Sequence, residues 1–496
     1  MTPTDLQARN LTLERELKWA QLKIQSLEER WRQHLIKLYG PKSETLSNLQ
    51  LDLLEEEPSV TRDEVEAEAS REPLPPKATR ERKPHPGRKP LPENLPRVET
   101  LVCADVNCKI CGCATSLIGY DESEVLDVEP ARWLVRVTKR EKRACGKCTT
   151  VAMPELAPRI VEKGLASDAV VIGTVVAKYC DHLPLYRQQA ILEREAGVEI
   201  SRATLDGWVM RVGELLGPVI AAMRRDLLNA SYLQADETTV PVQMHDKRGE
   251  NHQAYLWQYG KPGGETVFEF QLGRGREGPK KFLGNWEGIL QTDGYQAYDN
   301  IGGDKLVHVG CWAHARRKFV DAVKVNPKDA DAIAMVTRMD ALFLVDRHAR
   351  EQQLSGEERL ALRREHADSW ATEIHDECGK LRQAVLPKSA LGQAVSYTLN
   401  MWPKLRRCFH YAEVELSNNL AENSMRPIAL GRKNWLHVGS AQSGPKVAAI
   451  LSVVESCKRL GLPVKEYLQA VLPGLGRKKL SEVADLTPAR WAAFRN

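Results

Sequence analysis

The chain has 496 residues, of which 42% are hydrophobic and 28% are charged, and its formal net charge is +5. A chain of this length exceeds what one hydrophobic core supports, so we expect several domains. No run of about 18 uncharged apolar residues occurs, and the N-terminus lacks the apolar core of a secretory signal. We therefore expect a cytoplasmic protein without a membrane span, whose eleven cysteines are thiols and metal ligands rather than a disulfide framework.

Residues 6–38 repeat apolar side chains in a 4–3 alternation, which is the heptad pattern of a coiled coil. The repeat is formed by Leu13, Leu17, Ala20, Ile24, Leu27, Trp31 and Leu38, with His34 as a polar interruption. The pattern stops at Gly40 and Pro41. We expect residues 1–57 to be an oligomerisation segment of the leucine-zipper type and the protein to be a homo-oligomer. A single amphipathic helix packed on the body of the protein is the alternative.

Residues 58–100 are rich in proline and predict an extended linker, because proline fixes φ and removes a backbone donor. Residues 52–68 hold eight acids and one base, whereas residues 71–98 hold eight bases and three acids. A basic stretch of this kind contacts a polyanion such as nucleic acid, or it is a solvated spacer. Arg88 and Lys89 are the candidate DNA contacts, in the manner of a minor-groove arm.

Residues 101–150 predict a zinc ribbon. Two Cys-x-x-Cys pairs flank a segment, residues 132–138, that alternates apolar and polar side chains with the period of a strand. Two such pairs supply the four thiolates of a structural, tetrahedral Zn²⁺ site. The expected ligands are Cys108, Cys111, Cys145 and Cys148. Cys103 and Cys113 are near enough in sequence to replace one of them, and four reduced cysteines without metal are the alternative.

Residues 151–230 predict helices over 160–165, 169–179, 186–196 and 203–227. Gly197 begins a turn between the last two, and Ser201 is placed to cap the second. A helix, a glycine-containing turn and a second helix form the skeleton of a helix-turn-helix. We expect a DNA-binding region with Arg202 as a contact, against the alternative of a plain helical hairpin.

Residues 231–324 predict strands over 232–236, 254–259, 266–270, 288–292 and 306–309, with helices over 280–286 and 311–320. This is the order of a ribonuclease-H-like fold, in which an acid on the first strand lies beside an acid at the end of the fourth. Those acids are Asp236 and Asp293. Neighbouring strands lie about 4.8 Å apart, and two carboxylates this close are unfavourable without a divalent cation, so Mg²⁺ or Mn²⁺ is implied.

A third acid is expected from a later helix. Residues 325–410 lack strand alternation and predict a helical insertion, after which residues 411–446 return to the core. Glu422 lies there in a short helix that Ser417 or Asn418 caps and Pro427 ends. Arg426 shares the helical face of Glu422, and Arg432 and Lys433 add positive charge for a phosphate. The alternatives are Glu237 in place of Asp236, and Glu415 or Glu455 in place of Glu422. Residues 447–496 predict a helical tail.

Five motifs together resemble the insertion sequence 66 family of bacterial transposases. They are DETTVP (236–241), QTDGYQAY (291–298), CWAHARRKF (311–319), NNLAE (418–422) and GRKNW (431–435). The zipper, the zinc module and the helical tail match the layout of that family as well. The fold class that follows is a multidomain α/β protein with a ribonuclease-H-like catalytic domain and a helical insertion.

This resemblance implies a reaction of the DDE type, in which Asp236, Asp293 and Glu422 hold two Mg²⁺ or Mn²⁺ ions and DNA strands are cut and joined. The partners would be double-stranded DNA, as terminal inverted repeats and target, and helper proteins of the same element. Arg316 and Arg317 would face phosphate, held by Cys311 and His314; a second zinc on Cys311 and His314 is the alternative. Two other functions stay open: a non-mobile nuclease or resolvase with the same fold, and a zinc-ribbon regulator that binds DNA without cutting it.

Overall fold

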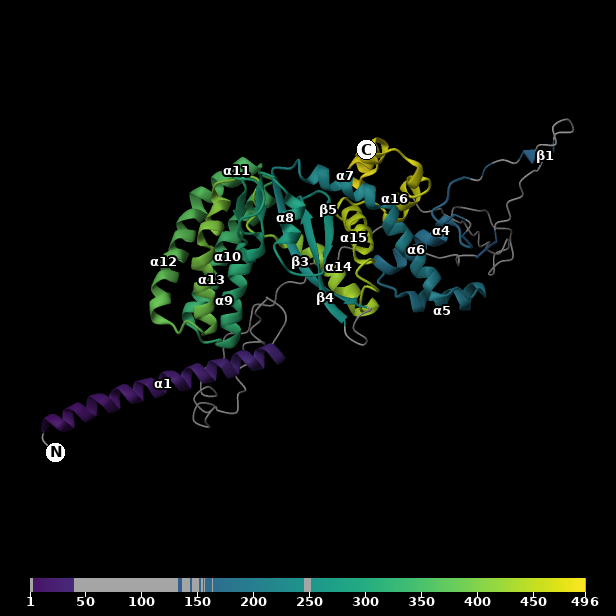
Figure 1. Ribbon diagram of the computed structural model, residues 1–496. Helices are drawn as coiled ribbons and strands as arrows, with labels where there is room; N and C mark the ends of the chain where they lie inside the picture. The colour runs from purple at the N-terminus through teal and green to yellow at the C-terminus, as the bar shows by residue number, and fades with distance from the viewer. Residues whose placement is uncertain are drawn as a thin grey trace, which may run out of the picture. The chain divides into compact units, whose positions relative to one another are not determined.

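The computed structural model describes residues 3–39, 133–135, 143–144, 151–152, 155, 157–162, 164–244 and 251–495 (Figure 1). The chain divides into two compact units, residues 1–57 with 141–496, and residues 58–140. The four expected zinc ligands and the candidate DNA contacts Arg88 and Lys89 lie outside the described residues. None of the described helices is both long and apolar enough to cross a membrane.

The N-terminal helix α1 spans Pro3–Tyr39 and ends immediately before Gly40. Five large side chains of its predicted heptad pattern are each more than half exposed: Leu13, Leu17, Ile24, Leu27 and Trp31. A seam of this kind is covered when helices pair, which is consistent with the expected coiled coil. The homo-oligomer itself stays a prediction.

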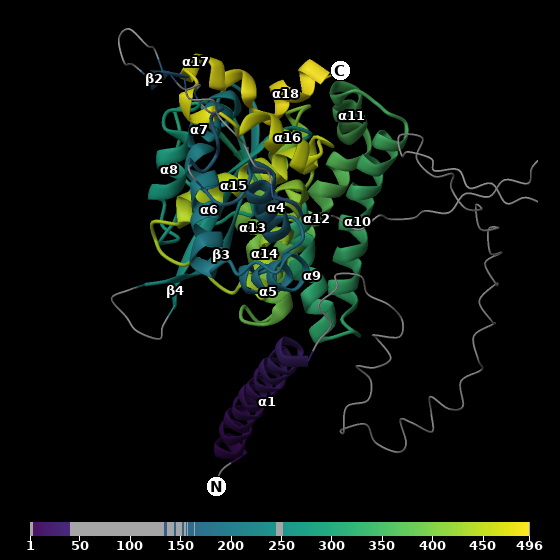
Figure 2. The same cartoon turned by 90° about the vertical axis from the view of Figure 1, so that its right-hand side faces the viewer.

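In the described part of the chain, four consecutive helices lie directly before the sheet: α4 (Asp168–Tyr179), α5 (Leu185–Ala196), α6 (Arg202–Leu215) and α7 (Gly217–Leu227). The turn between α5 and α6 is as predicted. Gly197 ends α5 with φ +64°, and the Ser201 hydroxyl caps α6 by accepting a hydrogen bond from Thr204 N. Figures 1 and 2 show α4, α5 and α6 grouped together, with α15 and α16 beside them.

Two helix predictions in this region are wrong. The single helix expected over 203–227 is divided at Leu216, because Pro218 stands in the first turn of α7 and has no N–H to continue the hydrogen-bond ladder. The helix expected over 160–165 is replaced by bends and a turn in the described part of that segment. There the Ile160 N–H is bonded to the Asp168 carboxylate at 3.0 Å instead of to a helical carbonyl.

Five strands within the described residues form one mixed sheet in the order β5-β4-β3-β6-β7. The strands are β3 (Tyr232–Gln243), β4 (Asn251–Gly260), β5 (Thr266–Gln271), β6 (Ile289–Gln291) and β7 (Val307–Val309). The first three form antiparallel pairs, whereas β6 is parallel to both β3 and β7. The five expected strands are therefore confirmed, and helix α8 (Glu277–Leu283) lies between β5 and β6 in the chain.

The edge strand β5 is covered by helix α15 (Gly444–Arg459). The Ser452 and Ser456 hydroxyls accept hydrogen bonds from the N–H groups of Phe268 and Thr266, at 2.8 and 3.0 Å. Two serines one helical turn apart thus match two outward N–H groups two residues apart on the strand. The contact satisfies an edge that would otherwise present unpaired backbone donors.

A bundle of helices follows β7 and has its own hydrophobic core, shared with the β6–β7 side of the sheet. Its helices are α9 (Trp312–Val325), α10 (Ala330–Glu351), α11 (Gly356–Leu362), α12 (Asp368–Ala384) and α13 (Ala390–Leu405). Figure 1 shows α9, α10, α12 and α13 running side by side. The fully buried Arg363 pairs with Asp346 at 2.6 Å and donates to the Val414 carbonyl at 2.6 Å, which ties the bundle to the segment that returns to the sheet.

Helix α14 (Asn419–Trp435) packs on β3 and β4. The expectation that Pro427 ends this helix is wrong, since the helix continues for two further turns. Proline removes only the hydrogen bond to the Asn423 carbonyl, and Asn423 is exposed to water. Burial of Met425, Ile428 and Trp435 holds the helix on the sheet on both sides of the missing hydrogen bond. The tail contains α15, α16 (Val464–Val471), α17 (Leu480–Val483) and α18 (Pro488–Arg495).

Candidate active site

Strand register brings the first two acids to one end of the sheet. Gln234 of β3 is the partner of Gln291 of β6 in the parallel ladder. Asp236 follows Gln234 by two residues, and Asp293 follows Gln291 by two residues. The acids therefore lie at equivalent positions beside the carboxyl end of the short strand β6, Asp293 just after that strand and Asp236 within the longer β3. Loops at this end of parallel strands commonly form binding and catalytic sites.

The neighbouring acids Asp236 and Glu237 project to opposite faces of β3, because side chains alternate along a strand. Glu237 is fully engaged on its own face, where Arg274 Nη2 lies 2.6 Å from Oε1 and the Tyr298 hydroxyl donates to Oε2 at 2.9 Å. Its side chain is only 2% exposed. Glu237 therefore has two structural partners on its face of β3, whereas Asp236 projects to the opposite face.

Asp236 is a carboxyl that resists ionisation in the metal-free protein. Burial raises its pKa to about 8, and the negative charges of Glu237, Asp293 and Glu422 add to the shift. Asp293 and Glu422, which the sequence placed with Asp236, thus act on it electrostatically in the fold. A partly buried group of carboxylates is the environment that a divalent cation relieves.

Asp293 sits in a turn that its own side chain closes. Its Oδ1 accepts a hydrogen bond from Tyr295 N at 2.8 Å, and its carbonyl accepts one from the Tyr397 hydroxyl of α13 at 2.6 Å. Gly294 has φ +91°, a conformation that side-chain-bearing residues rarely adopt. The helical bundle and the turn thus fix this acid together.

Two buried glutamines tie the segment before α14 to the sheet. Gln234 Nε2 donates to the Gln291 side chain at 2.9 Å and to the Ser417 carbonyl at 3.1 Å. Gln291 Nε2 donates to the Glu415 carbonyl at 2.7 Å. Sequence reasoning missed these positioning residues. The signal was present, because both acids are preceded by glutamine at the second position before them.

Glu422 lies in the first turn of α14, and its two carboxylate oxygens have different surroundings. Arg317 Nη2 of α9 lies 3.1 Å from Oε2. His314 Nε2 lies 3.6 Å from Oε1. Burial lowers the pKa of His314, an effect that Glu422 and Asp293 oppose. Cys311 is buried beside them, and burial raises the pKa of its thiol to about 12.

The other acids weighed for the third position are engaged elsewhere. Glu415 is paired with Arg359 at 2.8 Å and with Arg350. Glu455 of α15 accepts a hydrogen bond from Ser424, and burial raises its pKa. Neither is among the carboxylates that shift the pKa of Asp236. Of the candidates, Asp293 and Glu422 are those whose charges act on Asp236, and a shared metal site of the three acids stays a prediction.

The expected DNA contacts fall into two groups. Three are engaged with the protein: Arg316 pairs with Asp340 at 2.5 Å, Arg317 pairs with Glu422, and Arg432 donates to Thr238 and Thr239. Arg202, Arg426 and Lys433 are exposed. An exposed guanidinium or ammonium group is available to a phosphate without breaking an internal pair. DNA contact by any of the six stays a prediction.

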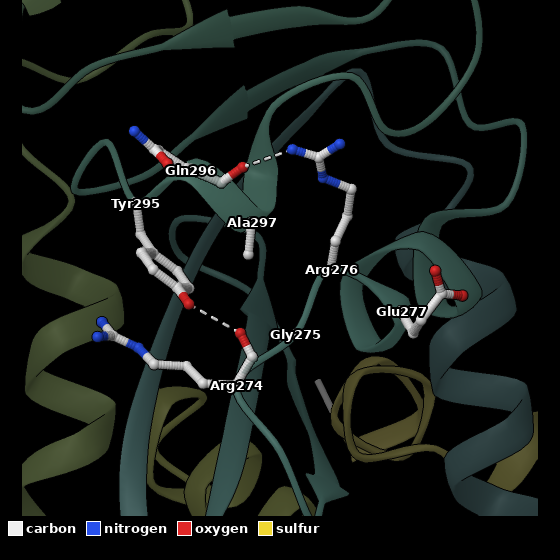
Figure 3. Close-up of a pocket in the computed structure, with 7 residues that line it drawn as sticks. All are labelled: Arg274, Gly275, Arg276, Glu277, Tyr295, Gln296 and Ala297. Carbon is white, nitrogen blue, oxygen red and sulfur yellow. Dashed lines mark hydrogen bonds between the residues drawn. The ribbon is translucent and has the colours of Figure 1, made fainter.

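A pocket of about 420 Å³ opens beside the Asp293 turn (Figure 3). Its lining consists of Arg274, Gly275, Arg276, Glu277, Tyr295, Gln296 and Ala297. The Arg274 guanidinium stacks on the Tyr295 ring at 3.9 Å, and Arg276 donates to the Gln296 carbonyl at 3.3 Å. Because Arg274 is paired with Glu237, Arg276 and Glu277 are the remaining charged residues of the lining, and Tyr295 follows the candidate catalytic acid Asp293 by two residues.

Three models of known protein families match parts of this chain. Residues 163–446 match the family model described as "Transposase IS66 family". Residues 105–149 match the zinc-finger binding domain of transposase IS66, and residues 26–100 match a model described as "Transposase C of IS166 homeodomain". The chain therefore belongs to the IS66 family of transposases, which confirms the resemblance drawn from the five motifs.

Relatives of similar length occur in Sinorhizobium fredii (strain NBRC 101917 / NGR234). Uncharacterized protein y4hP is 30% identical over 502 residues, which cover 95% of this chain and 88% of the relative. Uncharacterized protein y4qI is 31% identical over 424 residues, covering 82% and 78%. Membership of the family indicates action on DNA and use of zinc and a divalent metal. The zinc-finger match includes Cys108, Cys111, Cys145 and Cys148, whose role as the ligands stays a prediction.

Proposed function

We propose that this protein cuts the DNA ends of an insertion sequence and joins them to target DNA, using Asp236, Asp293 and Glu422 as one metal-binding unit. The observation that carries the proposal is the convergence of Asp293 and Glu422, from distant parts of the chain, on Asp236, whose pKa is raised to about 8 by burial and by the neighbouring carboxylates. The strand order β5-β4-β3-β6-β7, with the acids on β3 and after β6, supports a ribonuclease-H-like catalytic domain.

The donor set suits two hard divalent cations, Mg²⁺ or Mn²⁺. Carboxylate oxygens are the ligands these ions prefer, and bound cations would relieve the repulsion within the group. When bound, the ions would activate water or a DNA 3′-hydroxyl and stabilise the leaving oxygen. Asp236 and Asp293 hold their positions through the strand register, and Glu422 holds its position through the contacts of Gln234 and Gln291 with the segment before α14.

The remaining parts of the chain position DNA. Arg202 is exposed in the first turn of α6, the second helix of the helix-turn-helix-like pair. Arg276, at the pocket beside Asp293, offers positive charge for a phosphate near the acids. The exposed apolar seam of α1 supports a homo-oligomer, in which two copies would hold two DNA ends together.

The proposal is tested by incubating purified protein with Mg²⁺ and DNA that carries the terminal inverted repeats of the element, and mapping the products at nucleotide resolution. Nicks that expose 3′-hydroxyls at the ends, followed by joined products, are the expected result. Nicks without joined products would favour the nuclease or resolvase. Binding without cleavage, with or without proteins of the same element added, would favour the regulator.

The mass of the protein in solution tests the oligomer separately. Removing residues 1–57 is expected to lower the mass measured by light scattering while the circular dichroism of the remaining chain shows it folded. An unchanged mass would place the assembly contact outside α1.

A further inference from the structure

Three donor side chains of different chemistry meet where the beginning of α9 approaches the beginning of α14. Cys311 precedes α9, His314 lies in its first turn, and Glu422 lies in the first turn of α14. One donor atom from each lies within 4.8 Å of the other two. The motif around Cys311 and His314 was singled out in the sequence, and neither residue has a role in the reaction proposed above.

The contact between His314 and Glu422 has the wrong length for a hydrogen bond and the right length for two ligands of one ion. Nε2 and Oε1 are 3.6 Å apart, beyond the range of a hydrogen bond. Two ligands at about 2.0–2.2 Å from a tetrahedral ion are separated by roughly 3.3–3.6 Å. Within the described residues, Glu422 Oε1 and His314 Nδ1 are buried atoms without a hydrogen-bond partner.

The sulfur completes this set from the protein interior. Cys311 is fully buried, and its Sγ accepts a hydrogen bond from Asn418 N at 3.4 Å. Backbone N–H groups directed at a metal-bound sulfur are a common outer support of thiolate sites. A thiolate, an imidazole and one carboxylate oxygen select zinc-type ions over Mg²⁺, which prefers six oxygen ligands.

We propose that Cys311, His314 and Glu422 bind a transition-metal ion of the zinc type, and that this ion withdraws Glu422 from Asp236 and Asp293. Because Arg317 holds Oε2, Oε1 is the oxygen available to either partner. A zinc-type ion on Oε1 therefore competes with the catalytic ions for the third acid. The binding site stands on the donor geometry alone, whereas the competition rests on the proposed function.

The metal content of the full chain tests the binding site. The zinc finger contributes a constant background, so purified wild-type protein in zinc is expected to hold two ions per chain by elemental analysis. Cys311→Ala and His314→Gln are each expected to hold one. Cys378→Ala is the matched control, because Cys378 is equally buried but lies on α12, outside the donor group. Circular dichroism and thermal melting verify that each variant is folded.

Substitution with Co²⁺ identifies the ligand. The wild-type protein and Cys378→Ala should show equal sulfur-to-cobalt charge-transfer absorption, and Cys311→Ala should show less. Equal zinc content and equal cobalt spectra in all variants would overturn the site. Slower DNA cleavage by His314→Gln at unchanged metal content would also overturn it, since His314 would then only orient Glu422.

Cleavage of end DNA in Mg²⁺ tests the competition. Micromolar zinc is expected to inhibit the wild-type protein at least tenfold and to inhibit Cys311→Ala much less. Equal inhibition of both would overturn the competition and leave the binding site intact. If the wild-type protein cleaves no DNA at all, the metal content and the cobalt spectra still decide the site, so failure of the two proposals can be told apart.

Discussion

The β5 edge of the sheet and the place where β6 ends beside β3 both contact the C-terminal part of the chain, but through different groups. At β5, two serine hydroxyls of α15 satisfy strand N–H groups, and the packing around them is apolar. At β3 and β6, glutamine side chains bind the carbonyls of the segment before α14. The first contact satisfies the backbone N–H groups of the edge strand β5. The second lies next to Glu422, one of the carboxylates whose charges raise the pKa of Asp236.

The largest expected effect is on the chemistry at the β3–β6 end. Asp236→Asn, Asp293→Asn and Glu422→Gln should each lower strand cleavage by about a thousandfold or more, and double variants should lose little beyond that, since residues acting as a unit are not additive. Single-turnover cleavage of end DNA measures the loss. The controls are Asp304→Asn, at an exposed acid in the turn before β7, and Glu455→Gln on α15. An equal loss in either would remove the distinction between the candidate acids and ordinary carboxylates.

The second prediction concerns pH and the stability of the metal-free protein. Asp236 has a pKa of about 8 in the fold against an ordinary value of 3.8, so the folded state binds the extra proton between these values. Stability from this group is therefore lost as pH rises from about 4 to 8. At about 1.4 kcal/mol for each pKa unit, Asp236→Asn should be more stable than wild type by a few kcal/mol at pH 8 and equal to it near pH 4. Denaturant melts across this range, in chelator, measure the gain. A gain that does not vary with pH would contradict the raised pKa.

The third prediction separates positioning from chemistry. Gln234→Leu and Gln291→Leu remove the bonds to the Ser417 and Glu415 carbonyls, so Glu422 should be held less well. We expect cleavage to fall by roughly ten- to a hundredfold, which corresponds to about 1.4–2.7 kcal/mol, with DNA affinity unchanged. Gln188→Leu is the matched control, because Gln188 is a buried glutamine of α5 that also donates to main-chain carbonyls. If all three variants lower the free energy of unfolding and none lowers the cleavage rate of the folded protein, Gln234 and Gln291 have only a structural role.

The fourth prediction tests the closed edge. Ser452→Ala and Ser456→Ala each leave a buried strand N–H without its acceptor, which should lower the free energy of unfolding by about 1–3 kcal/mol. The cleavage rate of the folded fraction should stay at the wild-type value. Ser440→Ala, which alters a partly exposed turn, should cost less. Urea denaturation measures the loss of stability, and single-turnover cleavage on the same samples measures the rate. A loss of rate without a loss of stability would show that the β5 edge also positions the acids.

The smallest expected effect concerns DNA affinity. Arg202→Ala should weaken binding of end DNA a few-fold and reduce the salt dependence of the affinity by about one released ion. Arg225→Ala removes an exposed arginine of α7 and should change neither. Fluorescence anisotropy over a range of salt concentrations measures both quantities. Equal salt slopes for the two variants would count against the helix-turn-helix as the contact.

The sequence predicts those features that local patterns encode. The strands predicted over 254–259 and 266–270 are found as β4 and β5, and Ser201 and Gly197 marked the turn between α5 and α6. The two wrong predictions at Pro218 and Pro427 show that the effect of proline on a helix also depends on how the helix packs. The same residue breaks a helix at Leu216 but is accepted inside α14, where burial of Met425 and Ile428 compensates for the lost hydrogen bond. The partners of Gln234, Glu237 and Glu422 could not be predicted, because each is contributed by a segment distant in the chain.

The serine contacts at the β5 edge have a consequence for the order in which the protein is made. Thr266 and Ser456 are 190 residues apart, so the strand leaves the ribosome well before the helix that covers it. At about 5–20 residues per second, that edge stays open for roughly 10–40 seconds in every newly made chain. During this interval the nascent sheet exposes backbone donors to neighbouring polypeptides. Any chain truncated before α15 keeps that edge permanently, and aggregation rather than a shorter folded protein is its expected fate.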